Sequence, residues 1–199
     1  MDNKTINILI VGVGGQGVLL ASELLSEVAI MSGLDVKKSE VHGMSQRGGV
    51  VSSHVRISKK VYSPIIPYGQ ADILMAFEQA EGLRALDWLS AQGRAIISRT
   101  RLVPPIANFG TFSYPDDPIA EIKKKTGKVI AVDADCMARD LGNIRLVNTI
   151  LLAVASPYVG FERSVWDEAI RRLVKPKLVE INLKAFAQGY ELAAASTGI

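Results

Sequence analysis

The chain of 199 residues is long enough for one α/β domain with a sizeable core and short for two. Hydrophobic residues make up 48% and charged residues 22%, which is ordinary globular composition, and the net charge is only +3. The basic pairs are scattered along the chain, which argues against a nucleic-acid-binding groove. The longest apolar stretch, 149–159, is too short to span a membrane and contains Pro157.

The cysteine content and the first residues limit the cellular compartment and the cofactors that this chain can have. Cys136 is the only cysteine, which excludes a disulfide within the chain and a cluster held by four of its own cysteines. Acidic and amide residues stand at the start, and the first apolar run is only strand-length, so no secretory signal is expected. We expect a cytoplasmic protein in which Cys136 is a core residue.

The first half of the chain alternates between strand and helix patterns. A buried strand is predicted over 6–11, and the glycine-rich stretch 12–17 opens a helix whose apolar residues recur at helical spacing up to Met31. Strands follow over 35–41, 50–58, 73–77 and 95–98, and a helix is predicted over 79–90.

The second half begins with 102–118, which has no clear period and four prolines and is predicted to be irregular. A strand over 128–132 and helices over 134–141 and 144–156 come next, and Ser164 is expected to cap a helix that ends at Leu173. A final helix begins after Pro176. Because no linker interrupts the alternation, residues 1–199 are predicted to form one three-layer α/β/α domain with a largely parallel sheet and a Rossmann-like first βα unit.

The first candidate site is the glycine loop after the first strand, with Gly12, Gly14, Gly15, Gln16 and Gly17 as candidate cofactor-binding residues. Its G-x-G-x-x-G spacing lets backbone N–H groups approach a phosphate at the start of a helix. Glu40, near the end of the second predicted strand, lies about where an acid would bind the ribose of a dinucleotide. Dinucleotide binding, contact with another phosphate or cofactor, and simple helix–strand packing all remain open.

The second candidate site is the loop between the strands over 35–41 and 50–58. Its candidate ligand-binding residues are His42, Ser45, Gln46, Arg47, Gly48 and Gly49. Arg47 could hold a carboxylate or phosphate through its planar fork, and His42 could exchange a proton near neutral pH, which makes these two the catalytic candidates. The alternative is a polar hairpin loop with His42 capping backbone groups and Arg47 in a surface ion pair. No metal ligands are predicted.

Three quoted stretches carry a resemblance to a known family: GVGGQGVLLAS (12–22), SEVHGMSQRGGVVSSHVRIS (39–58) and VYSPIIP (61–67). They closely resemble the gamma-type subunits of 2-oxoacid:ferredoxin oxidoreductases, and HGMSQRGG is most similar to the indolepyruvate branch. Agreement continues through ADILMAFE (71–78), GNIRLVN (142–148) and NLKAFAQGYE (182–191), and so covers nearly the whole chain. The stretch Arg99-Thr100-Arg101 and the tail after Ala193 depart from the pattern.

The resemblance implies oxidative decarboxylation of a 2-oxoacid, an aryl pyruvate such as indolepyruvate, in anaerobic amino acid catabolism. The products would be acyl-CoA, CO2 and reduced ferredoxin, with CoA as co-substrate. Thiamine diphosphate, Mg²⁺ and [4Fe–4S] clusters would belong to a larger alpha subunit, and ferredoxin would be reached through the complex. This chain, inactive alone, would complete the alpha subunit's active site with the two loops described above.

Two other readings stay open. The glycine loop and Glu40 fit a self-contained NAD(P)-binding oxidoreductase, and the two loops could also serve a purely structural assembly subunit. The isolated chain is expected to be capable of forming a homodimer through an exposed partner surface. Asn143 and Asn148 are expected to make structural hydrogen bonds.

Overall fold

The computed structural model describes residues 5–43, 49–103 and 113–197, and places helices on both faces of a six-stranded sheet in the order β2-β3-β1-β4-β5-β6. The strands are β1 (Ile6–Val13), β2 (Asp35–His42), β3 (Val50–Ser58), β4 (Ala71–Ala76), β5 (Leu89–Ser98) and β6 (Val129–Val132). The α-helices are α1 (Val18–Met31), α2 (Gln79–Arg84), α3 (Pro118–Lys125), α4 (Ala134–Asp140), α5 (Val147–Val159), α6 (Arg163–Leu173) and α7 (Val179–Thr197). Short 3₁₀ turns stand at Leu86–Trp88, Ile144–Leu146 and Pro176–Leu178.

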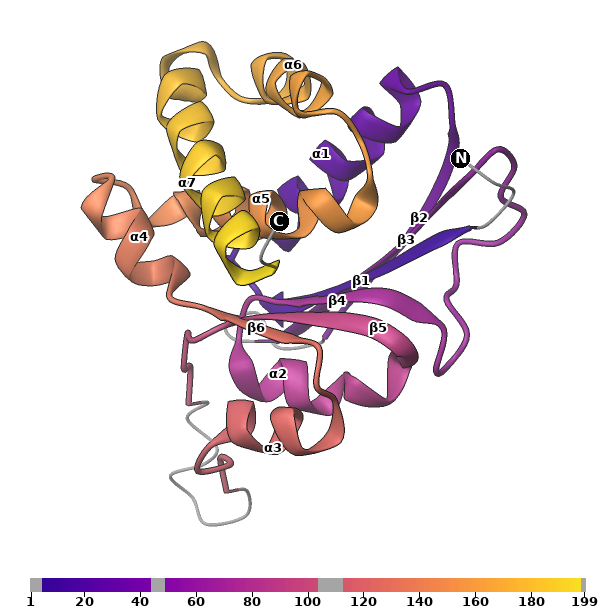
Figure 1. Cartoon of the computed structure of the whole chain (residues 1–199), viewed down its shortest axis with the longest axis vertical. Helices are drawn as coiled ribbons and strands as arrows, with labels where there is room; N and C mark the ends of the chain where they lie inside the picture. Colours follow the sequence, from indigo (N-terminus) through magenta and orange to yellow (C-terminus); the bar gives the residue numbers. More distant parts are fainter. Residues whose placement is uncertain (1–4, 44–48, 104–112, 198–199) are drawn as a thin grey trace.

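The predicted three layers are confirmed. Helices α1 and α4 to α7 cover one face of the sheet, and α2 and α3 cover the other (Figure 1). Alternate residues of each strand point to opposite faces, so Ile8 and Ile10 join the larger core with α1 and α5, while Leu9 and Val11 join the smaller core with α2 and α3.

The sheet is mixed but mostly parallel, as expected. β1 pairs in parallel with β4, β4 with β5, and β5 with β6. β3 lies between β1 and β2 and is antiparallel to both, so it alone runs against the other five strands. The β2–β3 pair is therefore a hairpin, and the loop at its tip emerges at the edge where β1 and β4 also end.

Helix α5 forms the centre of the larger core. Apart from Pro157 and Tyr158, all of its residues are buried, and it packs against α7 and against β4 and β5. Pro157 lacks an N–H to donate to the carbonyl of Ala153, and the hydroxyl of Ser156 donates to that carbonyl instead, at 2.8 Å. Trp166 of α6 and Phe186 of α7, with ring centroids 5.6 Å apart, close this core.

Three sequence expectations were wrong. The helix predicted over 79–90 ends at Arg84, and β5 already begins at Leu89, because Leu89 pairs with Ala71 across a register shift in the sheet. Helix α3 was missed, although Asp117 caps it with a bond to the N–H of Ala120 and Pro118 starts it.

The third error concerns the start of α6. This helix begins at Arg163, and its N-cap Glu162 makes no side-chain cap bond, so Ser164 does not cap it. Asp167, the other half of the expected capping box, instead accepts from Nε of Arg163 at 2.8 Å. This ion pair spans one turn of the helix surface and leaves the first turn without a side-chain cap.

The carboxyl ends of β1 and β4 define where a ligand would bind in this topology. The chain leaves β1 into α1 on one face and leaves β4 into α2 on the opposite face (Figure 1). Such a change of face opens a crevice between the two loops, which is the usual ligand position in open α/β sheets. In the described part of the chain, none of the helices is long and apolar enough to cross a membrane.

Candidate functional site

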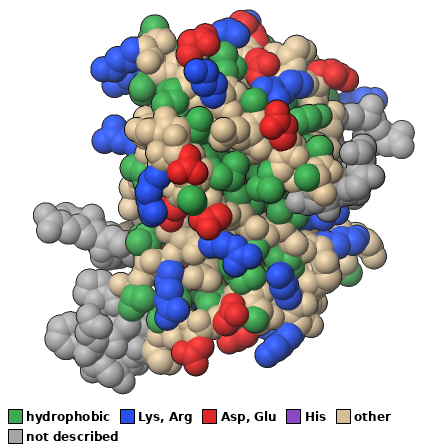
Figure 2. Space-filling model, turned by 60° about the vertical axis from the view of Figure 1, so that its left-hand side comes forward, with side chains coloured by type: hydrophobic (Ala, Val, Ile, Leu, Met, Phe, Trp, Pro, Cys, Tyr) green, Lys and Arg blue, Asp and Glu red, His purple; other side chains and the backbone are tan. Residues whose placement is uncertain are grey.

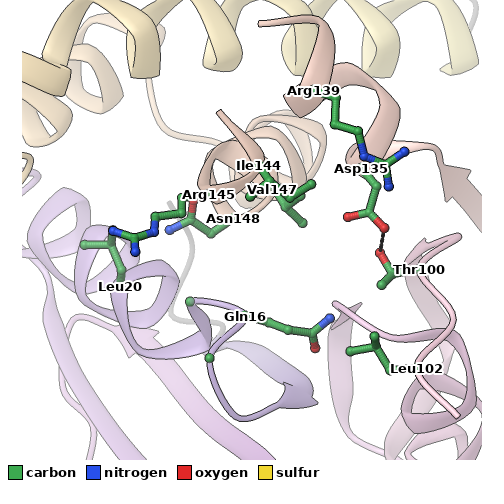
Figure 3. Close-up of a pocket in the computed structure, with 12 residues that line it drawn as sticks. Gln16, Leu20, Thr100, Leu102, Asp135, Arg139, Ile144, Arg145, Val147 and Asn148 are labelled. Carbon is green, nitrogen blue, oxygen red and sulfur yellow. Dashed lines mark hydrogen bonds between the residues drawn. The ribbon is translucent and has the colours of Figure 1, made fainter. Parts of the chain in front are cut away.

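A pocket of about 570 Å³ opens at this edge of the sheet, beside the glycine loop. Its residues come from four places: the glycine loop with the first turn of α1, the segment after β5, helix α4 after β6, and the start of α5. The lining residues are Gly15, Gln16, Gly17, Leu20, Thr100, Leu102, Asp135, Arg139, Ile144, Arg145, Val147 and Asn148 (Figure 3).

Two glycines of the loop are required by its geometry. Gly17, immediately before α1, has φ 88°, and a Cβ there would lie 3.1 Å from Nδ2 of Asn148. A Cβ on Gly12 would lie 2.8 Å from Oε1 of Gln16 and 2.9 Å from Cβ of Phe77. Gly12 therefore allows close packing. Gly17 has no side chain that could cap α1, so the N–H groups of the first turn of α1 stay available to an anion.

Gln16 is held inside the loop by two backbone partners. Its Oε1 accepts from the N–H of Val13 at 2.7 Å, and its Nε2 donates to the carbonyl of Phe77 at 3.0 Å. These bonds tie the end of β1 to the end of β4. Gln16 thus forms the floor of the pocket and keeps one amide N–H that these bonds do not use.

The second loop meets the first through the backbone. The N–H of Gly14 donates to the carbonyl of Gly49 at 3.0 Å, and the N–H of Gly43 donates to the carbonyl of Val50 at 2.7 Å. The backbone of His42 ends β2 opposite Val51. Ser45, Gln46, Arg47 and Gly48 lie outside the described residues.

Asn148 supplies a buried donor to the pocket. The residue is 3% exposed, and its Oδ1 accepts from the N–H of Thr149 at 2.8 Å. Among the described residues Nδ2 has no hydrogen-bond partner, and it lies near Gly17 on the pocket wall. The expected structural hydrogen bond is present, but only the oxygen makes it. The free N–H groups make Asn148 a candidate ligand contact as well.

The charges around the pocket are mostly positive. Arg139 of α4 and Arg145 before α5 are exposed and line it from two sides (Figure 3). The carboxylate of Asp135 accepts from the hydroxyl of Thr100 at 2.8 Å, which joins the segments after β6 and β5. Two guanidinium groups and the start of α1 therefore face a cavity in which one carboxylate is already hydrogen-bonded, an arrangement that favours an anionic ligand.

Exposed apolar side chains surround the same edge. Figure 2, turned toward this side, shows hydrophobic side chains gathered in the middle of the face with both basic and acidic side chains around them. Those near the strand ends are Leu19, Val41, Val50, Leu102, Val103 and Ile144, six of the eleven exposed large hydrophobic residues found in the described chain. A concentration of this kind at one edge marks a surface for a partner or ligand.

The geometry does not support the dinucleotide reading of Glu40. Because β3 separates β2 from β1, Glu40 stands two strands, about 10 Å, from the strand that carries the glycine loop. Its Oε1 accepts from Ser22 at 3.0 Å and from Lys38 at 3.1 Å. The carboxylate is therefore engaged with α1 and its own strand, not placed beside the loop.

Sequence reasoning placed Cys136 wrongly and overlooked part of the pocket. Cys136 is exposed because α4 buries the faces of Ala134 and Ala138 instead. Asn143 behaves as expected, since its Oδ1 accepts from the N–H of Arg145 at 3.1 Å. Arg139 and Arg145 were not predicted as site residues, although the quoted stretch GNIRLVN contains Arg145.

No group of three or more His, Cys, Asp or Glu side chains that could hold a metal occurs in the described ranges.

A family model described as pyruvate ferredoxin/flavodoxin oxidoreductase matches residues 7–192. The chain belongs to this family. The match spans the strand–glycine loop–helix unit, the β2–β3 hairpin and the helices that build the pocket. The chain is thus the small subunit of a 2-oxoacid:ferredoxin oxidoreductase complex that contains larger partner chains.

Curated relatives support the same family branch that the sequence motifs indicated. The chain is 40% identical to indolepyruvate oxidoreductase subunit IorB of Archaeoglobus fulgidus, over 94% of this chain and 95% of that protein. It is 38% identical to subunit IorB of Thermococcus kodakarensis, over 98% of this chain and 100% of that protein. The ketoisovalerate oxidoreductase subunit VorA of Methanothermobacter marburgensis is 30% identical, but the matched part is only 37% of that longer protein.

Solved structures share the fold. The gamma subunit of a keto/oxoacid ferredoxin oxidoreductase from Geobacter sulfurreducens matches with a TM-score of 0.71 and 25% identity, over 96% of this chain and 99% of that one. A chain of 2-oxoglutarate:ferredoxin oxidoreductase from Magnetococcus marinus, solved with 2-oxoglutarate, coenzyme A and succinyl-CoA bound, matches with a TM-score of 0.76 and 19% identity. That match covers 98% of this chain and 32% of the other.

Proposed function

We propose that this chain is the small subunit of an indolepyruvate-type oxidoreductase and completes the active site of a larger, thiamine-diphosphate-bearing subunit. In this proposal the pocket at the glycine loop holds the phosphorylated part of CoA. Thiamine diphosphate and the clusters of the partner subunit would supply the decarboxylation and electron-transfer chemistry, and this chain would hold CoA beside them. In this proposal the iron–sulfur clusters belong to the partner subunit, because this chain has one cysteine and such a cluster needs four.

The pocket itself is the observation that carries the proposal. The uncapped start of α1, the buried amide of Asn148 and the guanidinium groups of Arg139 and Arg145 all face one cavity. A diphosphate needs several N–H donors and positive charge together, and this combination supplies both. The apolar side chains around the opening would seat the partner subunit and exclude water from the transfer step.

The β2–β3 loop would lie at the junction with the partner. Its described ends reach the glycine loop through the Gly14–Gly49 hydrogen bond. We assign Arg47 to an anionic group, either the 2-oxoacid carboxylate or a CoA phosphate, with Ser45 and Gln46 orienting neighbouring groups. His42 would assist proton movement or hold the loop, and Gly48 and Gly49 would let backbone donors approach the same anion. These assignments rest on the sequence pattern and on the family resemblance.

Two alternatives are less well supported. A self-contained NAD(P)-dependent enzyme would need an acid beside the glycine loop, and Glu40 is engaged elsewhere. A purely structural subunit would have no use for two guanidinium groups and an amide nitrogen without a partner among the described residues, all around an open cavity. Homodimer formation by the isolated chain is compatible with the proposal, because the apolar edge would be uncovered when the larger subunit is absent.

The proposal is tested with Arg145→Ala in the complex reconstituted with the larger subunit. Loss of one charged contact to a phosphate should raise the KM for CoA about tenfold, while the KM for the 2-oxoacid changes little. Steady-state kinetics with indolepyruvate and pyruvate as substrates measure both constants and compare the two 2-oxoacids.

Arg171→Ala is the matched control, because Arg171 carries the same charge on α6, where it lies 3.7 Å from Glu180. It should leave both KM values unchanged. A wild-type KM for CoA in Arg145→Ala would overturn the CoA assignment, and higher efficiency with pyruvate than with indolepyruvate would overturn the substrate assignment.

A further inference from the structure

Glu78, between β4 and α2, has a side-chain carboxyl group that does not line the pocket. It is 1% exposed. Its Oε2 accepts from the N–H of Glu81 at 2.9 Å, and its Oε1 accepts from the N–H of Leu102 at 3.2 Å and from the hydroxyl of Tyr114. In the described part of the chain these donors are all neutral, so the buried carboxyl group is satisfied by hydrogen bonds and not by an ion pair.

The three donors come from segments that are far apart in the sequence. Glu81 belongs to α2, whereas Leu102 and Tyr114 lie on the connection from β5 to α3. The neighbouring N–H of Gln79 donates to the carbonyl of Thr100 at 3.1 Å. The start of α2 therefore fixes the backbone of this connection at two successive points, Thr100 and Leu102.

Those two points are part of the pocket wall. Thr100 and Leu102 line the cavity opposite Asn148 and Arg145 (Figure 3). A shift of either residue would change the width of the cavity. Since Glu78 holds this wall from the far side without lining the cavity, its influence on a ligand would be indirect.

Tyr114 is well suited to remain a donor in this arrangement. Burial and the adjacent Glu78 carboxylate raise the pKa of its hydroxyl, so the group stays protonated at neutral and moderately alkaline pH. The guanidinium of Arg101 lies over its ring, 4.6 Å from the centroid, which orients the ring. The hydroxyl is thus directed at Glu78 by contacts that a Phe at this position would keep.

We propose that Glu78 and Tyr114 are positioning residues that hold Thr100 and Leu102 in place as one wall of the pocket and thereby set the affinity for CoA. This inference rests on the proposed function of the pocket. Glu78 also caps α2 through Oε2. Removal of the Tyr114 hydroxyl leaves the Oε2 cap of α2 intact and removes only a hydrogen bond to Oε1. The substitution therefore tests the position of Leu102 separately from the stability of α2.

The test is Tyr114→Phe in the complex with the larger subunit. The KM for CoA should rise about three- to tenfold, while kcat and the KM for the 2-oxoacid stay within about twofold. Tyr158→Phe is the matched control: the Tyr158 hydroxyl is buried without a hydrogen-bond partner in the described structure, and it does not line the pocket. That variant should show wild-type constants.

The outcomes distinguish this inference from the function on which it rests. If Arg145→Ala raises the KM for CoA but Tyr114→Phe matches Tyr158→Phe, the positioning role is wrong and the pocket assignment stands. A fall in kcat equal to or larger than the change in KM would also overturn the positioning role. If Arg145→Ala leaves the KM for CoA unchanged, the proposed function fails first.

Discussion

At the scale of single residues, side chains at the strand ends divide between binding and internal support. Gln16 is used mainly inside the fold, because both ends of its amide bond backbone groups. In Asn148 the amide oxygen accepts from the N–H of Thr149, whereas the amide nitrogen lies at the pocket and has no partner among the described residues. Residue type alone could not separate these roles, since both are amides within the family motifs GVGGQGVLLAS and GNIRLVN.

His54 provides a pH prediction at this scale. It is buried on β3, its Nδ1 accepts from the N–H of Ile66 at 3.3 Å, and burial lowers its pKa below the usual 6.5. The unfolded chain therefore binds a proton near pH 6.5 while the folded chain does not. Stability is fully present above pH 6.5 and falls as the pH drops from there to the lower folded pKa.

His54→Asn should remove this contribution, because the Asn oxygen can still accept from the Ile66 N–H but does not titrate. Urea unfolding of wild type and variant between pH 5 and 7.5 measures it. The free energy of unfolding should decline less steeply with falling pH in the variant. Identical slopes for the two proteins would show that His54 does not titrate differently on folding.

At the scale of elements, polar groups join the helices of the larger core at specific points. The hydroxyl of Thr149 on α5 donates to Oδ1 of Asn182 on α7 at 2.6 Å, and Nδ2 of Asn182 donates to the carbonyl of Leu178 at 2.8 Å. Both residues are buried. This pair fixes the register of α7 against α5, and so supports the wall that carries Asn148.

Thr149→Val should lower the free energy of unfolding by about 1–3 kcal/mol, because it keeps the shape of the side chain but leaves Oδ1 of Asn182 without its donor. Urea denaturation monitored by circular dichroism measures the change. Ser53→Ala is the control, since the Ser53 hydroxyl is buried with no hydrogen-bond partner in the described chain. Its removal should leave the free energy of unfolding unchanged or raise it, because a buried hydroxyl without a partner carries a desolvation cost. Equal effects of the two substitutions would contradict the role given to the Thr149–Asn182 bond.

At the scale of the whole molecule, the sheet carries its pocket and most of its exposed apolar residues at one edge. The chain is a subunit of a complex with larger partner chains, so it needs a non-covalent interface with them. The apolar edge around the pocket is the surface we assign to it.

Ile144→Glu tests that surface. Ile144 is 50% exposed beside the pocket, so a carboxylate there should weaken association with the larger subunit at least tenfold without lowering the melting temperature of the isolated chain. Titration calorimetry or co-purification measures association. Ile30→Glu is the control, because Ile30 is 59% exposed in the last turn of α1, at the other end of that helix from the glycine loop. Equal weakening by both variants would sink the assignment of this edge.

The sequence by itself determined the strand–glycine loop–helix unit, the hairpin strands and the family. Those features depend on local patterns: the continuous apolar run of β1, the alternation in β3, the glycines where the chain turns, and the sequence motifs. The start of the last strand before the long connection was misread because Leu89 pairs with Ala71 of β4 before a register shift, and pairing partners are not visible in a local pattern.

Only the tertiary structure decided which of the candidate site residues lie close together. It inserted β3 between β1 and β2, which moved Glu40 away from the glycine loop and brought the hairpin loop beside it. It also gathered Asn148, Arg139 and Arg145 around one cavity. These contacts join residues many positions apart, and they depend on strand order and helix placement, which the whole core sets together.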